Sequence, residues 1–212
     1  MARPDGGIKL VARTFTAFPL VLCLAITACD FRQVSTGPEL PGGLPEHQLR
    51  KQEILDEFYE NPEAAKLAYR KQWEDGQVER AKDESVAANV IWLPLAGILI
   101  EHDTANYADY YSYIVPRLHS NDWEVASTAV SALRGARGRE SIDHIIRMLK
   151  DKRELVSAGA ALAIDYRLKS SLYDSSLKSD YLYAMAQMKN ICSDPRSVRG
   201  LERVCRENGL IR

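Results

Sequence analysis

Apolar residues recur at helical spacing along most of the chain from Glu46 onward. Positions three, four and seven apart are repeatedly apolar, and no set of segments alternates apolar and polar residues as half-buried strands do. The pattern therefore predicts an all-α fold. Pro62 after Asn61 and Pro195 after Asp194 indicate two helix starts, because proline fits the first turn of a helix. We expect helices over residues 46–60, 62–82, 83–101, 104–119, 121–134, 139–150, 153–168, 176–191 and 195–208.

The segment VAANVIWLPLAGILI, Val86 to Ile100, is apolar on all sides. It is shorter than the roughly 20 residues that a membrane-spanning helix needs. It also contains Asn89 and Pro94, and a proline inside a helix removes a backbone hydrogen bond. We therefore expect a buried central helix with a kink at Pro94.

Two stretches of the chain resemble each other at an offset of 31 residues. Each has apolar positions on both sides of a short polar turn, which predicts a helix, a turn and a second helix. Such a unit cannot bury its apolar face alone, so the two copies, clearest over residues 107–168, are expected to stack. The matching pairs are Ile114 and Ile145, Leu118 and Leu149, Val125 and Val156, Ala129 and Ala160, and Leu133 and Ile164.

The sequence of residues 122–164, DWEVASTAVSALRGARGRESIDHIIRMLKDKRELVSAGAALAI, resembles short HEAT-like repeats. The resemblance implies a right-handed stack of antiparallel helix pairs, a HEAT-like α-solenoid, whose general function is to offer binding surfaces. Ala126 and Ser157 stand where the family often has Arg, and Ile164-Asp165 replaces the Leu-Gly of the second copy. The family positions are filled by Asp122, Val125, Ala129, Leu133, Gly135, Ile142, Leu149, Asp151, Val156 and Ala160.

The first 28 residues have the form of a secretory signal. A basic stretch with Arg3, Lys9 and Arg13 precedes an apolar segment over residues 14–27, which is too short for a stable membrane-spanning helix. Ordinary signal peptidase prefers small residues at the first and third places before its cut, and Ile26 fits the third place poorly.

The motif Ile26-Thr27-Ala28-Cys29 resembles instead the bacterial lipoprotein box. The resemblance implies cleavage before Cys29, a thioether-linked diacylglyceryl group on its sulfur and an acyl chain such as palmitate on its amine. Several acyl chains suffice for stable membrane anchoring. Asp30 resembles the signal that retains enterobacterial lipoproteins in the inner membrane, facing the periplasm. A plain cleaved signal and an uncleaved anchor are the alternatives.

Residues 29–45 are expected to form a lipidated, flexible linker. The stretch VSTGPELPGGLPEHQ is too rich in Gly and Pro for regular structure. About 16 residues of coil have a root-mean-square reach of about 22 Å, so the tether can separate the folded part from a membrane. The predicted organisation is a signal peptide over 1–28, a linker over 29–45 and a helical-repeat domain over 46–212.

The charge of the chain argues against a nucleic-acid partner. The full sequence carries a net charge of −1, and removal of residues 1–28 makes it −3. The charge is unevenly divided: residues 117–212 hold 17 basic and 12 acidic residues, whereas residues 30–116 hold 8 basic and 16 acidic ones. A molecule with one basic and one acidic half is suited to electrostatic steering of a partner protein.

Cys192 and Cys205 are the two cysteines that remain after Cys23 leaves with the signal and Cys29 is lipidated. An oxidising compartment favours a disulfide between them. If Pro195 opens the final helix, however, Cys205 lies about 15 Å along that helix, whereas bonded cysteines have Cα atoms roughly 4.4–6.8 Å apart. We favour the bridge, and two buried thiols are the alternative.

No catalytic or phosphate-binding motif is present in the sequence. The four histidines are isolated, and the EHD triplet from Glu101 to Asp103 is more typical of a helix end than of a metal site. We therefore expect no catalytic residue, no metal and no cofactor beyond the lipid on Cys29. An enzyme with a spatially assembled site is the remote alternative.

Two sets of residues are candidates for binding a partner protein. Arg196, Arg199, Arg203 and Arg206 are spaced so that they share one face of the expected final helix, opposite its apolar residues. Tyr107, Tyr110 and Tyr111 lie on one expected helix and cannot all face the core, and Tyr is common at interfaces. A solvated helix face and ordinary helix packing are the respective alternatives.

Together these features predict a membrane-anchored, envelope-facing lipoprotein that acts as a non-catalytic, protein-binding scaffold. An immunity or inhibitor protein that captures a toxin is one version. An assembly or pilot factor for an envelope complex is the other.

Overall fold

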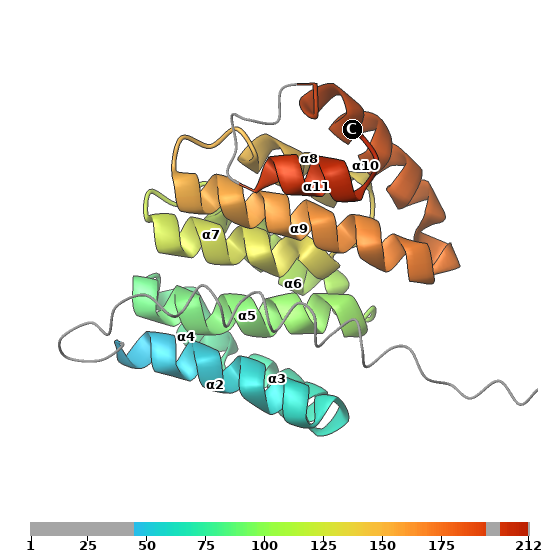
Figure 1. Cartoon of the computed structure of the whole chain (residues 1–212). Coiled ribbons are helices and arrows are strands. Elements are labelled where there is room, and N and C mark those ends of the chain that lie inside the picture. The colour runs from blue at the N-terminus through green and yellow to red at the C-terminus, as the bar shows by residue number, and fades with distance from the viewer. Residues whose placement is uncertain (1–44, 194–199, 212) are drawn as a thin grey trace, which may run out of the picture. The chain divides into compact units, whose positions relative to one another are not determined.

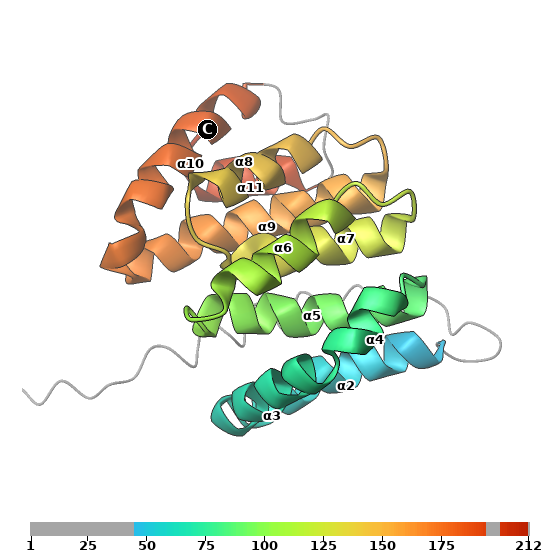
Figure 2. The ribbon, with the colours of Figure 1, turned by 180° about the vertical axis from the view of Figure 1, so that it is seen from behind.

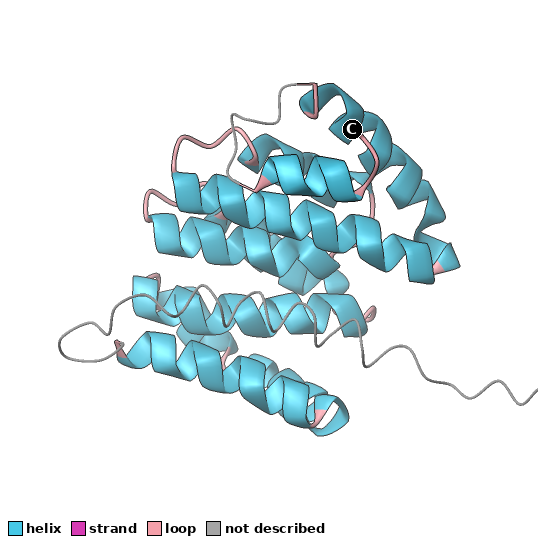
Figure 3. Cartoon of the chain, viewed as in Figure 1, coloured by secondary structure: helices cyan, strands magenta, loops and turns pink. Residues whose placement is uncertain are grey.

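The protein is described here by a computed structural model, in which residues 45–193 and 200–211 are described. Pro45–Arg212 forms one compact unit. Its described residues contain helices and loops and no strand, as the periodicity predicts (Figure 3). The elements are α2 (Glu46–Glu60), α3 (Pro62–Asp75), α4 (Gln77–Lys82), α5 (Val86–His102), α6 (Tyr107–Arg117), α7 (Trp123–Ala132), η1 (Leu133–Gly135), α8 (Arg139–Met148), α9 (Glu154–Tyr173), η2 (Ser175–Leu177), α10 (Lys178–Ile191) and α11 (Leu201–Glu207).

The helices form two layers. The front layer of Figure 1 contains α2, α5, α7, α9 and α11, and each of these helices packs on the next. The back layer, which faces the viewer in Figure 2, contains α3, α4, α6, α8 and α10. The turns that lead into α7 and α9 lie at the same end of the front layer, on the left in Figure 1.

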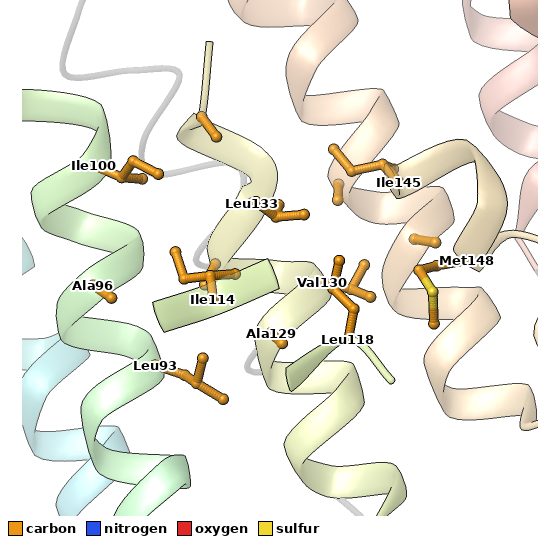
Figure 4. Close-up of a cluster of buried hydrophobic side chains, with 14 of the residues drawn as sticks. Leu93, Ala96, Ile100, Ile114, Leu118, Ala129, Val130, Leu133, Ile145 and Met148 are labelled. Atoms are coloured by element: carbon orange, nitrogen blue, oxygen red, sulfur yellow. The ribbon is translucent and has the colours of Figure 1, made fainter. Parts of the chain in front are cut away.

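The pairs of residues that the 31-residue offset matches are buried in both copies. Ile114 and Ile145 are fully buried, and the other four pairs are at most 3 % exposed. In the first copy they lie in α6 and α7, except that Leu118 directly follows α6 and Leu133 begins η1. In the second copy they lie in α8 and α9, except that Leu149 directly follows α8. Figure 4 shows buried side chains from α5, α6, α7 and α8 meeting in one shared core.

Helix α5 is the central element of the core. Nearly all of its residues from Ala88 to Ile100 are buried, and it packs against α2, α3, α6 and α7. Pro94 lies inside the helix and is also buried. Among the described residues, no helix combines the length and the apolar character that crossing a membrane requires. The burial of these residues confirms the interpretation of this segment as a core helix.

The single helix expected over residues 62–82 is interrupted at Gly76. A Cβ atom at this position would overlap the indole ring of Trp92, so only glycine fits here. The guanidinium of Arg80 lies 3.6 Å from the Trp73 ring centroid and donates to the Trp73 carbonyl oxygen. Trp92, whose ring excludes a side chain at Gly76, lies on the next long helix of the chain, which is why local periodicity misses the break.

The last helices also differ from the expectation. Helix α9 runs five residues past 168, because its last turns pack on α10, where Arg167 pairs with Asp180 at 2.9 Å. Helix α11 begins at Leu201 after Gly200, whose φ of 79° is left-handed. The predicted start at Pro195 lies outside the described residues.

The start of α11 at Leu201 removes the geometric objection to a disulfide between Cys192 and Cys205. Cys205 lies in the second turn of α11 rather than three turns along a longer helix. The Cα atoms of Cys192 and Cys205 are 5.7 Å apart, and their sulfurs are bonded. The structure therefore has the disulfide that the compartment argument favours.

Candidate protein-binding face

Small residues line the solvent-facing side of the front layer, and we call the surface that they form its floor. Gly97 of α5 lies so close to α7 that a Cβ atom there would be 2.8 Å from the Ala132 Cα. Gly159 of α9 faces α7 in the same way, with its Cβ position 3.3 Å from the Ser127 Oγ. Such close approach is what small residues permit. We call this surface the α5–α7–α9 face, and it comprises Gly97, Ser127, Ser131, Ala158, Gly159 and Leu162.

Hydroxyl groups on the floor are used within the layer. The Ser127 Oγ donates to the Leu155 carbonyl oxygen at 3.3 Å, across from α7 to α9. The Ser131 Oγ donates to the carbonyl oxygen of Ser127 at 3.0 Å. The floor therefore offers few free polar groups to solvent, although it is only partly buried.

Helix α9 presents an apolar stripe on this face. Leu155, Ala158, Gly159 and Leu162 follow one another at spacings of three, one and three residues, which places them on one side of the helix. Leu162 is 40 % exposed and is one of the large apolar side chains that the described structure leaves uncovered. The opposite sides of α9 are buried against α7, α8, α10 and α11.

A polar cluster borders the face beyond Leu162, near the C-terminal ends of α5 and α7. Tyr166, one turn after Leu162, donates to the Glu101 Oε1 at 2.7 Å. Burial and the charge of Glu101 raise the pKa of the Tyr166 hydroxyl, so it stays protonated at neutral pH. The Arg134 guanidinium lies 5.1 Å from the Tyr166 ring. This cluster therefore combines a carboxylate, a guanidinium cation and an aromatic ring.

Helix α2 borders the face at the other end. The Lys51 Nζ lies 3.3 Å from the Thr128 Oγ1 of α7. Burial lowers the pKa of Lys51, although the charge of Glu124 opposes the shift. The Nε2 of His47 lies 3.6 Å from the Oε1 of Glu124. Helical periodicity does not predict that these groups lie together, because they belong to helices that are far apart in the sequence.

Tyr110 is a core residue, and its prediction as a partner-binding residue is therefore corrected. It is fully buried, and its hydroxyl donates to the Asp103 Oδ2 at 2.8 Å. Its ring meets that of Trp73 edge to face. Tyr110 lies on the side of α6 that faces the core, whereas Tyr107 and Tyr111 are half-buried on the back layer.

Tyr107 and Tyr111 form a small aromatic cluster with His144. Their rings stack at 5.7 Å, and the Tyr111 ring lies 6.3 Å from that of His144. Tyr107 also donates to the Arg137 carbonyl oxygen and accepts from the Arg137 N–H. Most of the surface of this pair is thus engaged within the molecule.

The arginines of the final helix are only partly described. Arg203 and Arg206 are exposed on α11, and each faces an acid one turn away, Glu207 at 3.8 Å and Glu202 at 2.6 Å. The described helix is therefore a mixed-charge surface rather than a purely basic one. Arg196 and Arg199 lie outside the described residues, as do Cys29 and Asp30. The structure does not bring the described arginines next to the tyrosines, because α11 is in the front layer and α6 in the back (Figures 1 and 2).

The EHD triplet closes α5 and has structural partners. Asp103 is the residue after the helix, is buried rather than solvated, and pairs with Arg70 at 2.9 Å. Burial alone would raise the pKa of Asp103, but hydrogen bonds from Asn106 and Tyr110 and the Arg70 charge outweigh it and lower the pKa. No group of three or more potential metal ligands occurs in the described part of the chain.

In comparisons with known proteins, no family model matches the chain, and neither a curated protein nor a solved structure matches it.

Proposed function

We propose that this chain is a membrane-anchored, envelope-facing lipoprotein that works as a non-catalytic, HEAT-like helical-repeat scaffold and binds another protein on its α5–α7–α9 face. The observation that carries the proposal is the uncovered apolar stripe around Leu162, which lies on a floor of small residues. A smooth floor lets a helix or backbone segment of a partner approach closely, and the exposed leucine supplies an apolar anchor.

The repeat arrangement supports the scaffold part of the proposal. The two copies bury equivalent residues, and their second helices, α7 and α9, pack side by side in one layer. Stacked helix pairs of this kind build extended binding surfaces from one side of each unit. The occupant that we propose is a protein segment with apolar residues facing Leu162 and polar residues facing Glu101 and Arg134.

Affinity capture from chemically crosslinked native envelopes tests the binding part. We expect the tagged full-length protein to capture one stoichiometric partner, and we expect Leu162→Glu to lose it. Leu182→Glu is the matched control, because Leu182 is 59 % exposed on α10 in the back layer. Equal capture by both variants, or no partner for the unaltered protein, would refute the proposed face.

Anchoring is tested separately with Cys29→Ala. We expect the unaltered protein to incorporate labelled palmitate and to float with membranes, and the variant to lose the label. Retention of the label by Cys29→Ala would exclude Cys29 as the lipidated residue. If the captured partner is toxic when produced alone, the immunity version is supported; membership of an envelope complex would support the assembly version.

A further inference from the structure

Large exposed apolar side chains gather at the end of the front layer where α7 and α9 begin. Trp123, the first residue of α7, is 49 % exposed, and Leu155, in the first turn of α9, is 48 % exposed. The other two tryptophans of the protein, Trp73 and Trp92, are buried. We call this end, formed by the turns over residues 118–122 and 149–153 and by the first turns of α7 and α9, the turn edge.

Exposed cations lie in or just before the second turn of this edge. Lys150 and Lys152 are exposed in the turn over residues 149–153, and Arg147 is exposed near the end of α8, which leads into that turn. Four acids lie at this end. Asp151 pairs with Arg153 at 2.7 Å, and Asp122 accepts the backbone N–H groups of Glu124 and Val125. Glu124 lies 3.6 Å from His47, and Glu154 is exposed at the start of α9. A shallow hollow of about 450 Å³ opens between the two turns, and its lining includes His119, Ser120, Arg147, Lys150 and Arg153.

The turn edge is also where the folded unit receives the tether. Helix α2 begins at Glu46, directly after Pro45, and its first turn is held at α7 because the His47 Nε2 lies 3.6 Å from the Glu124 Oε1. Glu124 is the neighbour of Trp123. The linker before Pro45 therefore joins the folded unit next to the turn edge.

From this coincidence we infer that the turn edge docks on an anionic lipid surface. Trp123 and Leu155 enter the headgroup region, where Trp is favoured, and Arg147, Lys150 and Lys152 face the lipid phosphates, one of which fits the hollow between the turns. Attraction between basic side chains and anionic lipids acts only within about a Debye length, about 8 Å at physiological salt, so docking needs the tether to bring the edge close. This inference rests on the lipid anchor of the proposed function.

Docking would leave the α5–α7–α9 face accessible from the side. The turn edge is one end of the front layer, and the face runs along that layer away from it (Figure 1). The anchored protein would thus hold its binding face at a fixed orientation to the membrane rather than at any angle that the tether permits.

Fluorescence quenching in vesicles tests the inference on the full-length, lipid-modified protein. The protein is reconstituted in phosphatidylglycerol-containing vesicles whose acyl chains are brominated near the headgroup. We expect loss of up to about a third of the tryptophan emission, because one of three tryptophans is within reach of the quencher. Trp123→Phe should abolish this quenching, and vesicles of pure phosphatidylcholine should reduce it.

Charge reversal provides the matched control. We expect Lys150→Glu with Lys152→Glu to reduce the quenching at least about twofold. Lys178→Glu with Lys189→Glu makes the same change of charge on exposed residues of α10 and should leave the quenching unchanged. Equal effects of the two double variants would overturn the inference.

Flotation and intact mass separate the outcomes. A protein that carries its lipid and floats with vesicles, but whose Trp123 is not quenched, would refute docking and leave the anchor intact. Shielding of Trp123 only after a partner protein is added would assign the turn edge to a protein interface and would also refute docking. A protein without lipid that does not float would refute the anchor, and docking with it.

Discussion

Individual polar residues in the interior fix how the later helices pack. Arg167 of α9 is 3 % exposed, and its Nη2 donates to the Asp180 Oδ2 of α10 at 2.9 Å. The same carboxylate accepts the Gly138 N–H at 2.8 Å. One buried acid therefore joins α9, α10 and the loop before α8, and a buried charge left without its partner is costly.

Replacing Asp180 should accordingly destabilise the fold. We expect Asp180→Asn to lower the free energy of unfolding by about 3–5 kcal/mol, because it leaves the Arg167 charge buried and uncompensated. Chemical denaturation followed by circular dichroism measures the change. Asp75→Asn, on the exposed end of α3, is the control and should change stability by less than about 0.5 kcal/mol. Similar losses in both variants would contradict the role of the pair.

His144 should make stability depend on pH. Burial and the nearby charge of Arg147 lower the pKa of His144, although Glu140 opposes the shift. Below about pH 6.5, the unfolded chain takes up a proton that the folded protein resists, so the free energy of unfolding falls as the pH decreases until the folded-state pKa is reached. We expect His144→Gln to reduce the change in unfolding midpoint between pH 7.5 and pH 5. An unchanged difference would show that other groups cause it.

At the scale of helices, the local sequence predicted the helices themselves better than the junctions between them. Helical periodicity predicted α2 from residue 46 to 60, and the repeat offset predicted which residues of α6 to α9 are buried. It missed the break at Gly76, which depends on the packing of Trp92. It also missed the break at Gly200, whose left-handed φ of 79° precedes α11. The candidate face was missed as well, since no single helix contains it and small residues carry no periodic signal.

The two helical glycines of the face offer a matched test of helix packing. Alanine normally stabilises a helix by about 1 kcal/mol relative to glycine. At Gly97 a new Cβ would meet the backbone of Ala132, so we expect Gly97→Ala to destabilise by about 1–3 kcal/mol. At Gly159 the nearest atom would be the Ser127 Oγ at 3.3 Å, which can rotate, and the next would lie at 3.8 Å, an ordinary contact distance. We therefore expect Gly159→Ala to be neutral or stabilising. Thermal unfolding compares them, and equal effects would contradict the close approach of α5 and α7.

The disulfide should hold α11 at the end of α10, because Cys192 directly follows α10 and Cys205 lies in α11. Cys192 and Cys205 enclose a short loop, with a sequence separation of 13 residues, and closing a loop of this size stabilises by roughly 3 kcal/mol. We expect reduction, or Cys205→Ser, to lower the melting temperature and to raise amide exchange in residues 200–208 before the rest of the molecule. Mass spectrometry without reductant checks the bond. Unchanged exchange in α11 after reduction would show that packing alone holds it.

At the scale of the whole molecule, the uneven charge, the α5–α7–α9 face and the turn edge suit a protein that binds a partner at a membrane. The acidic residues 30–116 include α2 to α5, and the basic residues 117–212 include the turn edge and α7 to α11. The α5–α7–α9 face crosses this boundary, with Glu101 on one side and Arg134 on the other. A partner with complementary charges would therefore be oriented as it arrives.

Site-specific photocrosslinking in living cells tests the central claim most directly. A photoreactive amino acid replaces Leu162 on the proposed face in one variant and Leu182 on the back layer in another, in otherwise full-length protein. We predict one discrete protein adduct from position 162 that is absent from position 182. The same adducts from both positions, or none from position 162, would contradict the claim that this protein acts by binding a partner on its α5–α7–α9 face.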